Sequence, residues 1–362
     1  MTKISGPDSE ALFPILQTKL APLVRRAAEA AQLSDGHEVE YMGLEVKSIL
    51  NWSVSKRRDW QVWSINPYRG CEFACRYCYA RYTHEFLEPK PEPGAPPVTP
   101  YYQAFEQKIF VKQHAAWLLE QELRKLEKQG RLPQDEIAIG TATDPYQPIE
   151  RREQVTRSLL EVFARKSGLG LGIITKSTLI ERDIDLLREI ASRNRLSLHI
   201  TITTPDAQLA RMLEPRAPRP DLRFRTVARL RAAGLRVGVM CCPLMPGITD
   251  SVAALERMAK LSAQADACFM AANTLYLKPC SKPVFFKFIA ENYPHLQKEY
   301  AERFAVRDFA TPWYAREISA RVAAVCKKHK LGQRRDKEAL GMIREDKKSV
   351  ASVQPEQRRL FA

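Results

Sequence analysis

The chain has 362 residues, of which 45% are hydrophobic and 27% are charged. This length and composition are typical of a globular protein with a substantial core, in one large or two ordinary domains. No apolar run approaches the roughly 18 residues that a membrane span needs, and residues 1–10 lack the basic and apolar regions of a secretory signal. The formal net charge of +15 fits a polyanionic partner or merely a basic, solvated surface.

The elements expected before the first cysteine are a helix and a strand. A helix is predicted up to about Gly36. The apolar residues at helical spacing there are Leu20, Val24, Ala27 and Ala31. Residues 61–66 alternate enough to form a strand, which would lead the chain into a cluster of cysteines.

Three of the eight cysteines, Cys71, Cys75 and Cys78, follow this strand with the spacing C-x3-C-x2-C. A short loop of this kind can place three thiolates around one small object, and thiolates suit iron–sulfur clusters, zinc and Cu(I). One alternative is a trio of inert buried thiols. Another is a structural zinc site, which usually has four protein ligands, with His84 as the nearby candidate for the fourth. The third is a [4Fe–4S] cluster held by three thiolates, with one iron left for a small molecule.

The motif, with Tyr77 before its last cysteine, resembles the signature of the radical S-adenosylmethionine (SAM) superfamily. The longer match, Asn-Pro-Tyr-Arg-Gly-Cys followed by Cys-x-Tyr-Cys-Tyr-Ala-Arg, is similar to the branch related to spore photoproduct lyase, the DNA repair photolyase-like proteins. The resemblance implies a [4Fe–4S] cluster on the three cysteines, with SAM bound to its open iron. It further implies reductive cleavage of SAM to methionine and a 5′-deoxyadenosyl radical, with flavodoxin or ferredoxin as electron donor.

After the cysteines, short apolar strands alternate with helices, which predicts a parallel sheet. The expected strands are residues 136–141, 169–175, 196–203, 235–242 and 267–277. Together with residues 61–66 they make six βα units, too few for a closed eight-stranded barrel. We therefore expect an α/β fold, and the resemblance implies a partial (β/α)6 radical SAM barrel. The expected parts are an N-terminal helical extension (1–56), the core (57–283) and a C-terminal helical segment with a basic tail (284–362).

Ligands of parallel α/β folds bind at the carboxyl ends of the strands. Thr143 and Asp144 follow the second strand, and they either contact a cofactor or form a turn and helix cap. Asp144 and Glu150 could also offer negative charge to a cationic amine. Lys176 and Thr201 follow or end the next two strands, and the resemblance implies that they contact SAM. The alternatives are a simply exposed lysine and a threonine favoured by β-propensity.

We therefore expect a cofactor site that comprises Tyr77, Thr143, Asp144, Lys176 and Thr201 beside the cluster. The resemblance implies hydrogen abstraction from a substrate at the barrel mouth, with a nucleic acid lesion as the first choice. Alternatives are an RNA, protein or small-molecule substrate, or a zinc-stabilised nucleic-acid-binding module that is not an enzyme. Residues 205–236 hold eight arginines and three acids, which form a solvated helix face or contact phosphates.

The remaining cysteines bear on the reaction and on the compartment. In spore photoproduct lyase a cysteine outside the motif is thought to return a hydrogen atom to the substrate. The candidates here are Cys241, Cys242, Cys268 and Cys280, because no cysteine lies between Tyr79 and Met240. The cysteine pattern does not resemble an extracellular disulfide framework, and an oxygen-sensitive cluster needs reducing conditions, so we expect a cytoplasmic protein with no membrane partner.

Overall fold

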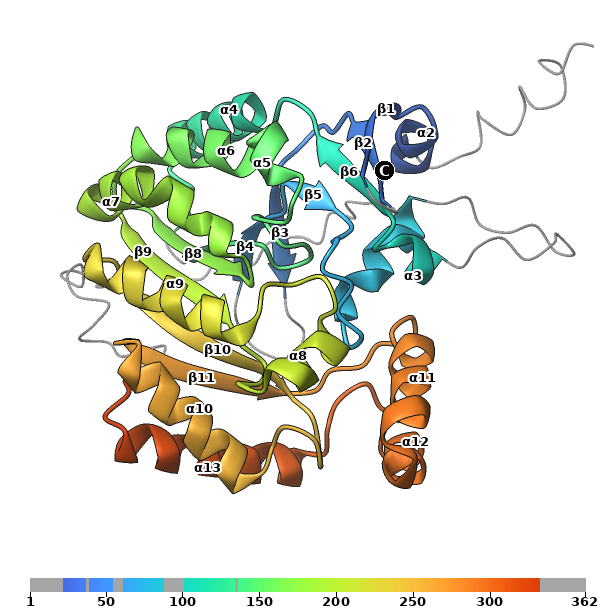
Figure 1. Ribbon diagram of the computed structural model, residues 1–362. Coiled ribbons are helices and arrows are strands. Elements are labelled where there is room, and N and C mark those ends of the chain that lie inside the picture. The colour runs from blue at the N-terminus through green and yellow to red at the C-terminus, as the bar shows by residue number, and fades with distance from the viewer. Residues whose placement is uncertain (1–21, 37–38, 55–60, 88–100, 134–135, 333–362) are drawn as a thin grey trace, which may run out of the picture.

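The computed structural model describes residues 22–36, 39–54, 61–87, 101–133 and 136–332. Its largest feature is a seven-stranded sheet in the order β11-β10-β9-β8-β7-β4-β3 (Figure 1). Six of these strands are parallel neighbours, and β3 is antiparallel to β4. Their bounds are β3 (Leu50–Val54), β4 (Gln61–Ile65), β7 (Glu136–Ile139), β8 (Gly170–Thr175), β9 (Arg195–Thr201), β10 (Val237–Leu244) and β11 (Phe269–Thr274). Since β3 and β11 are the two ends of the order, the sheet is open, and the predicted partial barrel of six parallel strands is confirmed.

Helices cover the outer side of this sheet, as Figure 1 shows. They are α4 (Ala115–Lys128), α6 (Val155–Ala164), α7 (Ile184–Arg193), α9 (Pro220–Ala232), α10 (Val252–Gln264) and α13 (Pro312–Lys328). Their apolar faces and the strands form the main core, in which Leu159, Ile173 and Val239 are fully buried. Strands that are buried in this way are near-continuously apolar, which is why the sequence pattern located them.

A smaller sheet has the order β1-β2-β6-β5. Its strands are β1 (Ala31–Gly36), β2 (Val39–Leu44), β5 (Tyr68–Arg69) and β6 (Lys108–Lys112), with α2 (Pro22–Ala28) before them. The prediction of a helix up to about Gly36 is therefore wrong beyond Ala28. In β2, Val39 and Tyr41 are buried while Glu40 is exposed, and pairing of β2 with both β1 and β6 outweighs the local helical spacing.

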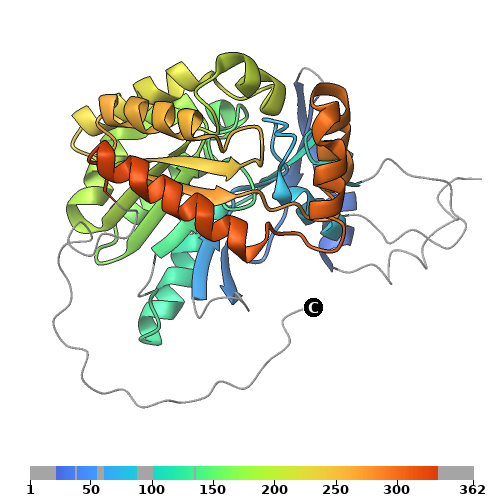
Figure 2. The same ribbon diagram turned by 90° about the horizontal axis from the view of Figure 1, so that it is seen from below.

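The described residues after β11 are mainly helical. The helix α13 lies against β11 and α10, whereas α11 (Lys282–Asn292) and α12 (Gln297–Arg303) lie beyond the N-terminal end of α13, where Arg303 contacts Tyr314 (Figure 2). The shorter elements are α3 (Tyr101–Ala104), α5 (Glu150–Glu153), α8 (Ala207–Leu213), η2 (Tyr79–Phe86), η3 (Thr178–Asp183) and η4 (Pro294–Leu296). The basic tail beyond residue 332 lies outside the described residues. No helix in the described part of the chain is long and apolar enough to cross a membrane.

Candidate functional site

The cysteine loop begins where the two sheets meet, because β4 belongs to the large sheet and β5 to the small one. Gly70 follows β5 with a φ of +85°, and a Cβ atom at this position would lie 2.8 Å from the carbonyl oxygen of Phe105. Only glycine fits such a position. The amide of Cys71 donates to the same Phe105 oxygen at 3.0 Å, and the hydroxyl of Thr143 donates to the Gly70 carbonyl at 2.6 Å. The start of the loop is thus held from both sides.

Glu72, inside the motif, ties the loop to the N-terminal sheet. Its buried carboxylate accepts a hydrogen bond from the Tyr41 hydroxyl of β2 at 2.8 Å and one from the Ile149 amide at 3.1 Å. Its own amide donates to the side-chain oxygen of Gln147 at 3.0 Å. The N-terminal part of the chain is therefore part of the support of the cysteine loop, which the sequence did not suggest.

The three thiols lie close enough to influence one another, and Cys75 is 7% exposed. Burial, followed by the Asp144 carboxylate, raises the pKa of Cys71, and burial raises the pKa of Cys75 to about 12. Burial also raises the pKa of Cys78. Thiols must lose their protons to bind a metal, so assembly of a metal centre here would release protons.

His84 does not supply a fourth ligand. It is 1% exposed, its Nε2 atom contacts the carbonyl oxygen of Lys108 at 3.0 Å, and its ring packs against Phe105 and Phe110. Burial lowers its pKa to about 4. Among the described residues, no group of three or more His, Cys, Asp or Glu side chains is arranged to hold one metal ion. A structural zinc site usually has four protein ligands, whereas a cluster with one open iron needs only the three thiols that the described residues provide.

Thr143 and Asp144 lie at the carboxyl edge as expected, and both have protein partners. The Thr143 hydroxyl holds Gly70, as described above. The Asp144 carboxylate accepts hydrogen bonds from the Thr175 hydroxyl at 2.6 Å, the Lys176 amide at 2.8 Å and the Tyr146 amide at 2.9 Å. Burial raises the pKa of Asp144 despite these donors. The two residues thus join the cysteine loop to the ends of β7 and β8.

A buried ion pair lies beside the loop. Arg223 of α9 contacts the Glu214 carboxylate at 2.6 Å, and both side chains are 1% exposed. Glu214 also accepts hydrogen bonds from the Tyr77 hydroxyl and, at 2.7 Å, from the Thr203 hydroxyl. Burial would raise the pKa of Glu214, but Arg223 and Lys176 lower it overall. Sequence reasoning missed Glu214, and its only signal was an isolated acid within an arginine-rich segment.

Lys176 follows β8, and Thr201 ends the neighbouring strand β9, at the same edge of the sheet. The Lys176 ammonium lies 5.8 Å from the centre of the Tyr77 ring, and no acceptor for this ammonium occurs among the described residues. Burial alone would lower the pKa of Lys176, but the nearby Cys75 and Glu214 raise it overall. Thr201 is buried, and its carbonyl accepts from Arg223 at 3.0 Å. The structure therefore places Tyr77, Lys176 and Thr201 around one network, with the Lys176 ammonium near Cys75, Glu214 and Asp144.

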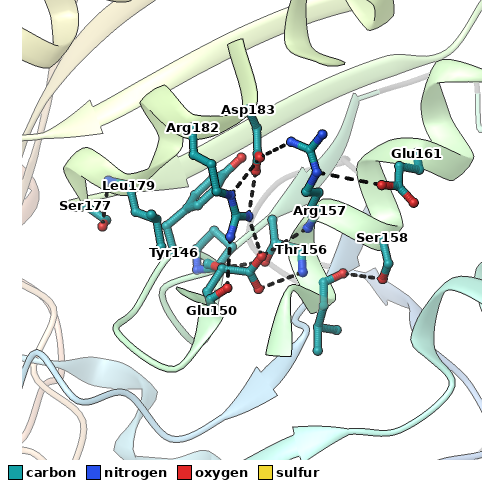
Figure 3. Close-up of polar contacts among 12 residues, drawn as sticks. Tyr146, Glu150, Thr156, Arg157, Ser158, Glu161, Ser177, Leu179, Arg182 and Asp183 are labelled. Atoms are coloured by element: carbon teal, nitrogen blue, oxygen red, sulfur yellow. Dashed lines mark hydrogen bonds and ion pairs between the residues drawn. The ribbon is translucent and has the colours of Figure 1, made fainter. Parts of the chain in front are cut away.

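Glu150 belongs to a separate buried network (Figure 3). Its carboxylate, 0% exposed, pairs with Arg182 at 2.8 Å, accepts the Tyr68 hydroxyl, and caps α6 through the Thr156 amide at 2.8 Å. Arg182 also pairs with the buried Asp183 at 2.8 Å. The suggestion that Glu150 offers its charge to a cofactor amine is therefore wrong, because that charge is neutralised within the protein.

The arginines of residues 205–236 all contact protein groups. The structure therefore favours the interpretation of this stretch as a solvated helix face over phosphate contact. Arg225 pairs with Asp221 at 3.1 Å, and Arg229 pairs with Glu181 at 2.6 Å. The others contact acids, carbonyls or a hydroxyl: Arg211, Arg216, Arg219, Arg223, Arg231 and Arg236. Phosphate contact by this stretch would require these pairs to open.

The spare cysteines differ in their distance from the carboxyl edge. Cys268 precedes β11 and so lies at the opposite edge of the sheet, while Cys241 is 1% exposed in the core. Cys242 follows Cys241 near the carboxyl end of β10. Cys280 follows β11, adjoins Ser281, and has a pKa raised mainly by burial and slightly by the nearby Cys78. Of the predicted donor candidates, Cys280 thus lies near the cysteine loop, and Cys242 lies towards the carboxyl edge of the sheet.

Residues 65–259, more than half of the chain, match the family model described as the radical SAM superfamily. Uncharacterized proteins of Mycobacterium tuberculosis and Mycobacterium bovis are 33% identical over 269 residues, which is 74% of this chain and 75% of each relative. An uncharacterized protein of Methanocaldococcus jannaschii is 26% identical over 186 residues, or 51% of this chain and 61% of that protein. The chain therefore belongs to the radical SAM superfamily, and a [4Fe–4S] cluster and SAM are its cofactors.

Solved structures share the fold. A spore photoproduct lyase mutant with bound AdoMet and dinucleoside spore photoproduct has a TM-score of 0.59 at 13% identity, over 84% of this chain and 86% of that chain. A second mutant with the same dinucleoside has a TM-score of 0.58 at 13% identity, over 85% of this chain and 92% of that chain. The chain therefore shares the fold of spore photoproduct lyase, as the predicted resemblance implied.

Proposed function

We propose that this radical SAM enzyme abstracts a hydrogen atom from a nucleic acid, by the reductive cleavage of SAM that its cofactors support. When bound, the reduced cluster supplies the electron that splits SAM into methionine and a 5′-deoxyadenosyl radical. The observation that carries the proposal is the set of three thiols, Cys71, Cys75 and Cys78, of which Cys75 is buried and the other two are half-buried. No fourth protein ligand for them occurs among the described residues, and the Lys176 ammonium lies beside them. The protein would bind and orient the cofactors and exclude water.

The predicted contact residues receive different roles from their surroundings. Lys176 would bind the carboxylate of SAM, because its ammonium keeps its proton and has no acceptor in the described structure. Tyr77 and Thr201, at the same edge, would border the cofactor. Thr143 and Asp144 would act mainly by fixing Gly70 and the Lys176 amide, since their side-chain oxygens already have protein partners.

The first test is assembly of the cofactor site. Protein purified without oxygen and reconstituted with iron and sulfide should hold about four irons per chain, and with SAM and dithionite it should release 5′-deoxyadenosine. Cys75→Ala should abolish both, whereas Cys241→Ala, in the core and outside the motif, should retain iron. A colourless wild-type protein with one zinc and no iron would refute the proposal.

The substrate class is the finer part of the proposal. It is supported by the net charge of +15 and by the fold that the chain shares with spore photoproduct lyase, whose solved structures hold a dinucleoside photoproduct. Retention of the reconstituted protein on DNA should fall steeply as salt rises, because phosphate contacts release counterions. Release of 5′-deoxyadenosine should increase with a dinucleotide photoproduct, and absence of DNA binding at low salt would move the substrate to a protein or small molecule.

A further inference from the structure

The cysteine loop is held by one buried acid that lies far from it in sequence. The Glu214 carboxylate accepts the hydroxyl of Tyr77, which stands between Cys75 and Cys78. The preceding residue of α8, Leu213, accepts the Arg76 amide at 2.9 Å through its carbonyl. Two successive residues of the β9–α9 connection therefore contact two successive residues of the motif.

Glu214 itself has little freedom to move. Arg223 pairs with it at 2.6 Å, and the same guanidinium donates to the carbonyls of Pro218 at 2.7 Å and Thr201 at 3.0 Å. Thr203 donates to Glu214 and lies 2.9 Å from the Tyr77 hydroxyl. The carboxylate is thus fixed by groups from the end of β9 and from α9, and the Tyr77 ring is fixed with it.

The fixed ring has a neighbour that matters for the cofactor. The Lys176 ammonium lies 5.8 Å from the centre of the Tyr77 ring, within the range of a cation–π contact. The Lys176 ammonium also interacts electrostatically with Cys75, Glu214 and Asp144, so it lies among the cysteine loop, Glu214 and the residues that follow β7. Orientation of the tyrosine therefore also sets where this charge lies.

We propose that Glu214, held by Arg223, is a positioning residue of the SAM site: it fixes the Tyr77 ring and, through that ring, the Lys176 ammonium. The proposal deepens the proposed function and rests on it. It differs from a general stabilising role because it requires the effect of Glu214 to pass through the Tyr77 hydroxyl.

The chain offers a matched control. Glu150 is also a buried carboxylate that accepts a tyrosine hydroxyl, from Tyr68, and pairs with an arginine, Arg182. Glu150→Gln and Glu214→Gln are therefore the same chemical change in similar surroundings, but only Glu214 contacts the cysteine motif through a side-chain hydroxyl of that motif.

The experiment is a double-mutant cycle on reconstituted protein, with SAM affinity and the electron paramagnetic resonance spectrum of the reduced cluster as readouts. Tyr77→Phe should weaken SAM binding ~10-fold in the wild-type background, the lower end of the effect of supporting residues at metal sites. In the Glu214→Gln background the same substitution should have less than a ~2-fold effect, because coupled residues are not additive. In the Glu150→Gln background the full ~10-fold effect should remain.

The spectrum should agree with the binding data. The change in the cluster signal on SAM addition should be altered alike in Tyr77→Phe, Glu214→Gln and their combination, and unaltered in Glu150→Gln. Equal effects of Tyr77→Phe in all backgrounds would overturn the positioning role while leaving the radical SAM function intact. A wild-type protein without iron would instead overturn the proposed function beneath it.

Discussion

Two ionic networks lie at the carboxyl edge of the large sheet, and they differ in whether every charged side chain has a partner within the described protein. In the first, Glu150 and Asp183 are matched by Arg182 and Arg157, and the charges are satisfied within the protein (Figure 3). In the second, Glu214 pairs with Arg223, and the Lys176 ammonium, which lies near both Glu214 and Asp144, has no hydrogen-bond acceptor among the described residues. A closed network joins structural elements, whereas a network with an uncommitted cation beside three thiols is suited to an anionic ligand.

The largest expected effect tests the closed network. Arg182→Met would leave the fully buried Glu150 and Asp183 with fewer cationic partners, and removal of one partner from a buried pair typically costs about 3–5 kcal/mol. Urea unfolding should show this loss in the free energy of unfolding. The fraction that remains folded should bind iron and SAM as the wild type does. Normal stability of this variant would show that the network is not a structural one.

Lys112 is a second lysine whose pKa the fold shifts, in the direction opposite to that of Lys176. Lys112 is 6% exposed, and burial, with a small contribution from Arg69, lowers its pKa to about 7. The unfolded chain, with a lysine pKa of about 10.4, binds more protons than the folded chain between pH 7 and that value, so stability should rise with pH in this range.

Lys112→Met should remove this rise of stability with pH. It should also increase the free energy of unfolding at pH 7 by on the order of 2–4 kcal/mol. The measurement is the free energy of unfolding at several pH values, as a difference between variant and wild type, so that other titrating groups cancel. Identical pH dependence in the two proteins would mean that Lys112 is charged and solvated in the folded chain.

The open network predicts an effect on binding with little effect on stability. Lys176→Met should weaken SAM binding by about 2 kcal/mol, or roughly 30-fold, because the SAM carboxylate would lose its cation. Iron content should not change. Lys166→Met, which removes a lysine paired with Glu127 on the surface at 3.4 Å, is the control and should bind SAM normally. Unchanged SAM affinity in Lys176→Met would remove Lys176 from the site.

The sequence was sufficient where chemistry or periodicity is local. The spacing of Cys71, Cys75 and Cys78 indicated the radical SAM superfamily, which the family match confirms. The apolar runs of the parallel strands, with the resemblance, indicated the partial barrel, which the strand order confirms. It failed at β1, where pairing with β2 replaced a helical pattern, and at Glu150, whose arginine partner lies 32 residues away. Glu214 contacts Tyr77 across 137 residues, and such pairing appears only once the chain is folded.

The smallest expected effect concerns the exposed ion pairs of α9. Arg225→Gln and Arg229→Gln each break a solvent-exposed pair, and such pairs contribute about 0.2–1 kcal/mol. Because Asp221 and Glu181 already neutralise these arginines, we expect the double variant to retain wild-type DNA binding at every salt concentration. Thermal unfolding and DNA retention measure the two effects on one preparation. A smaller salt dependence of DNA binding in the double variant would show that the pairs open to contact phosphates, and α9 would then be part of the nucleic acid surface.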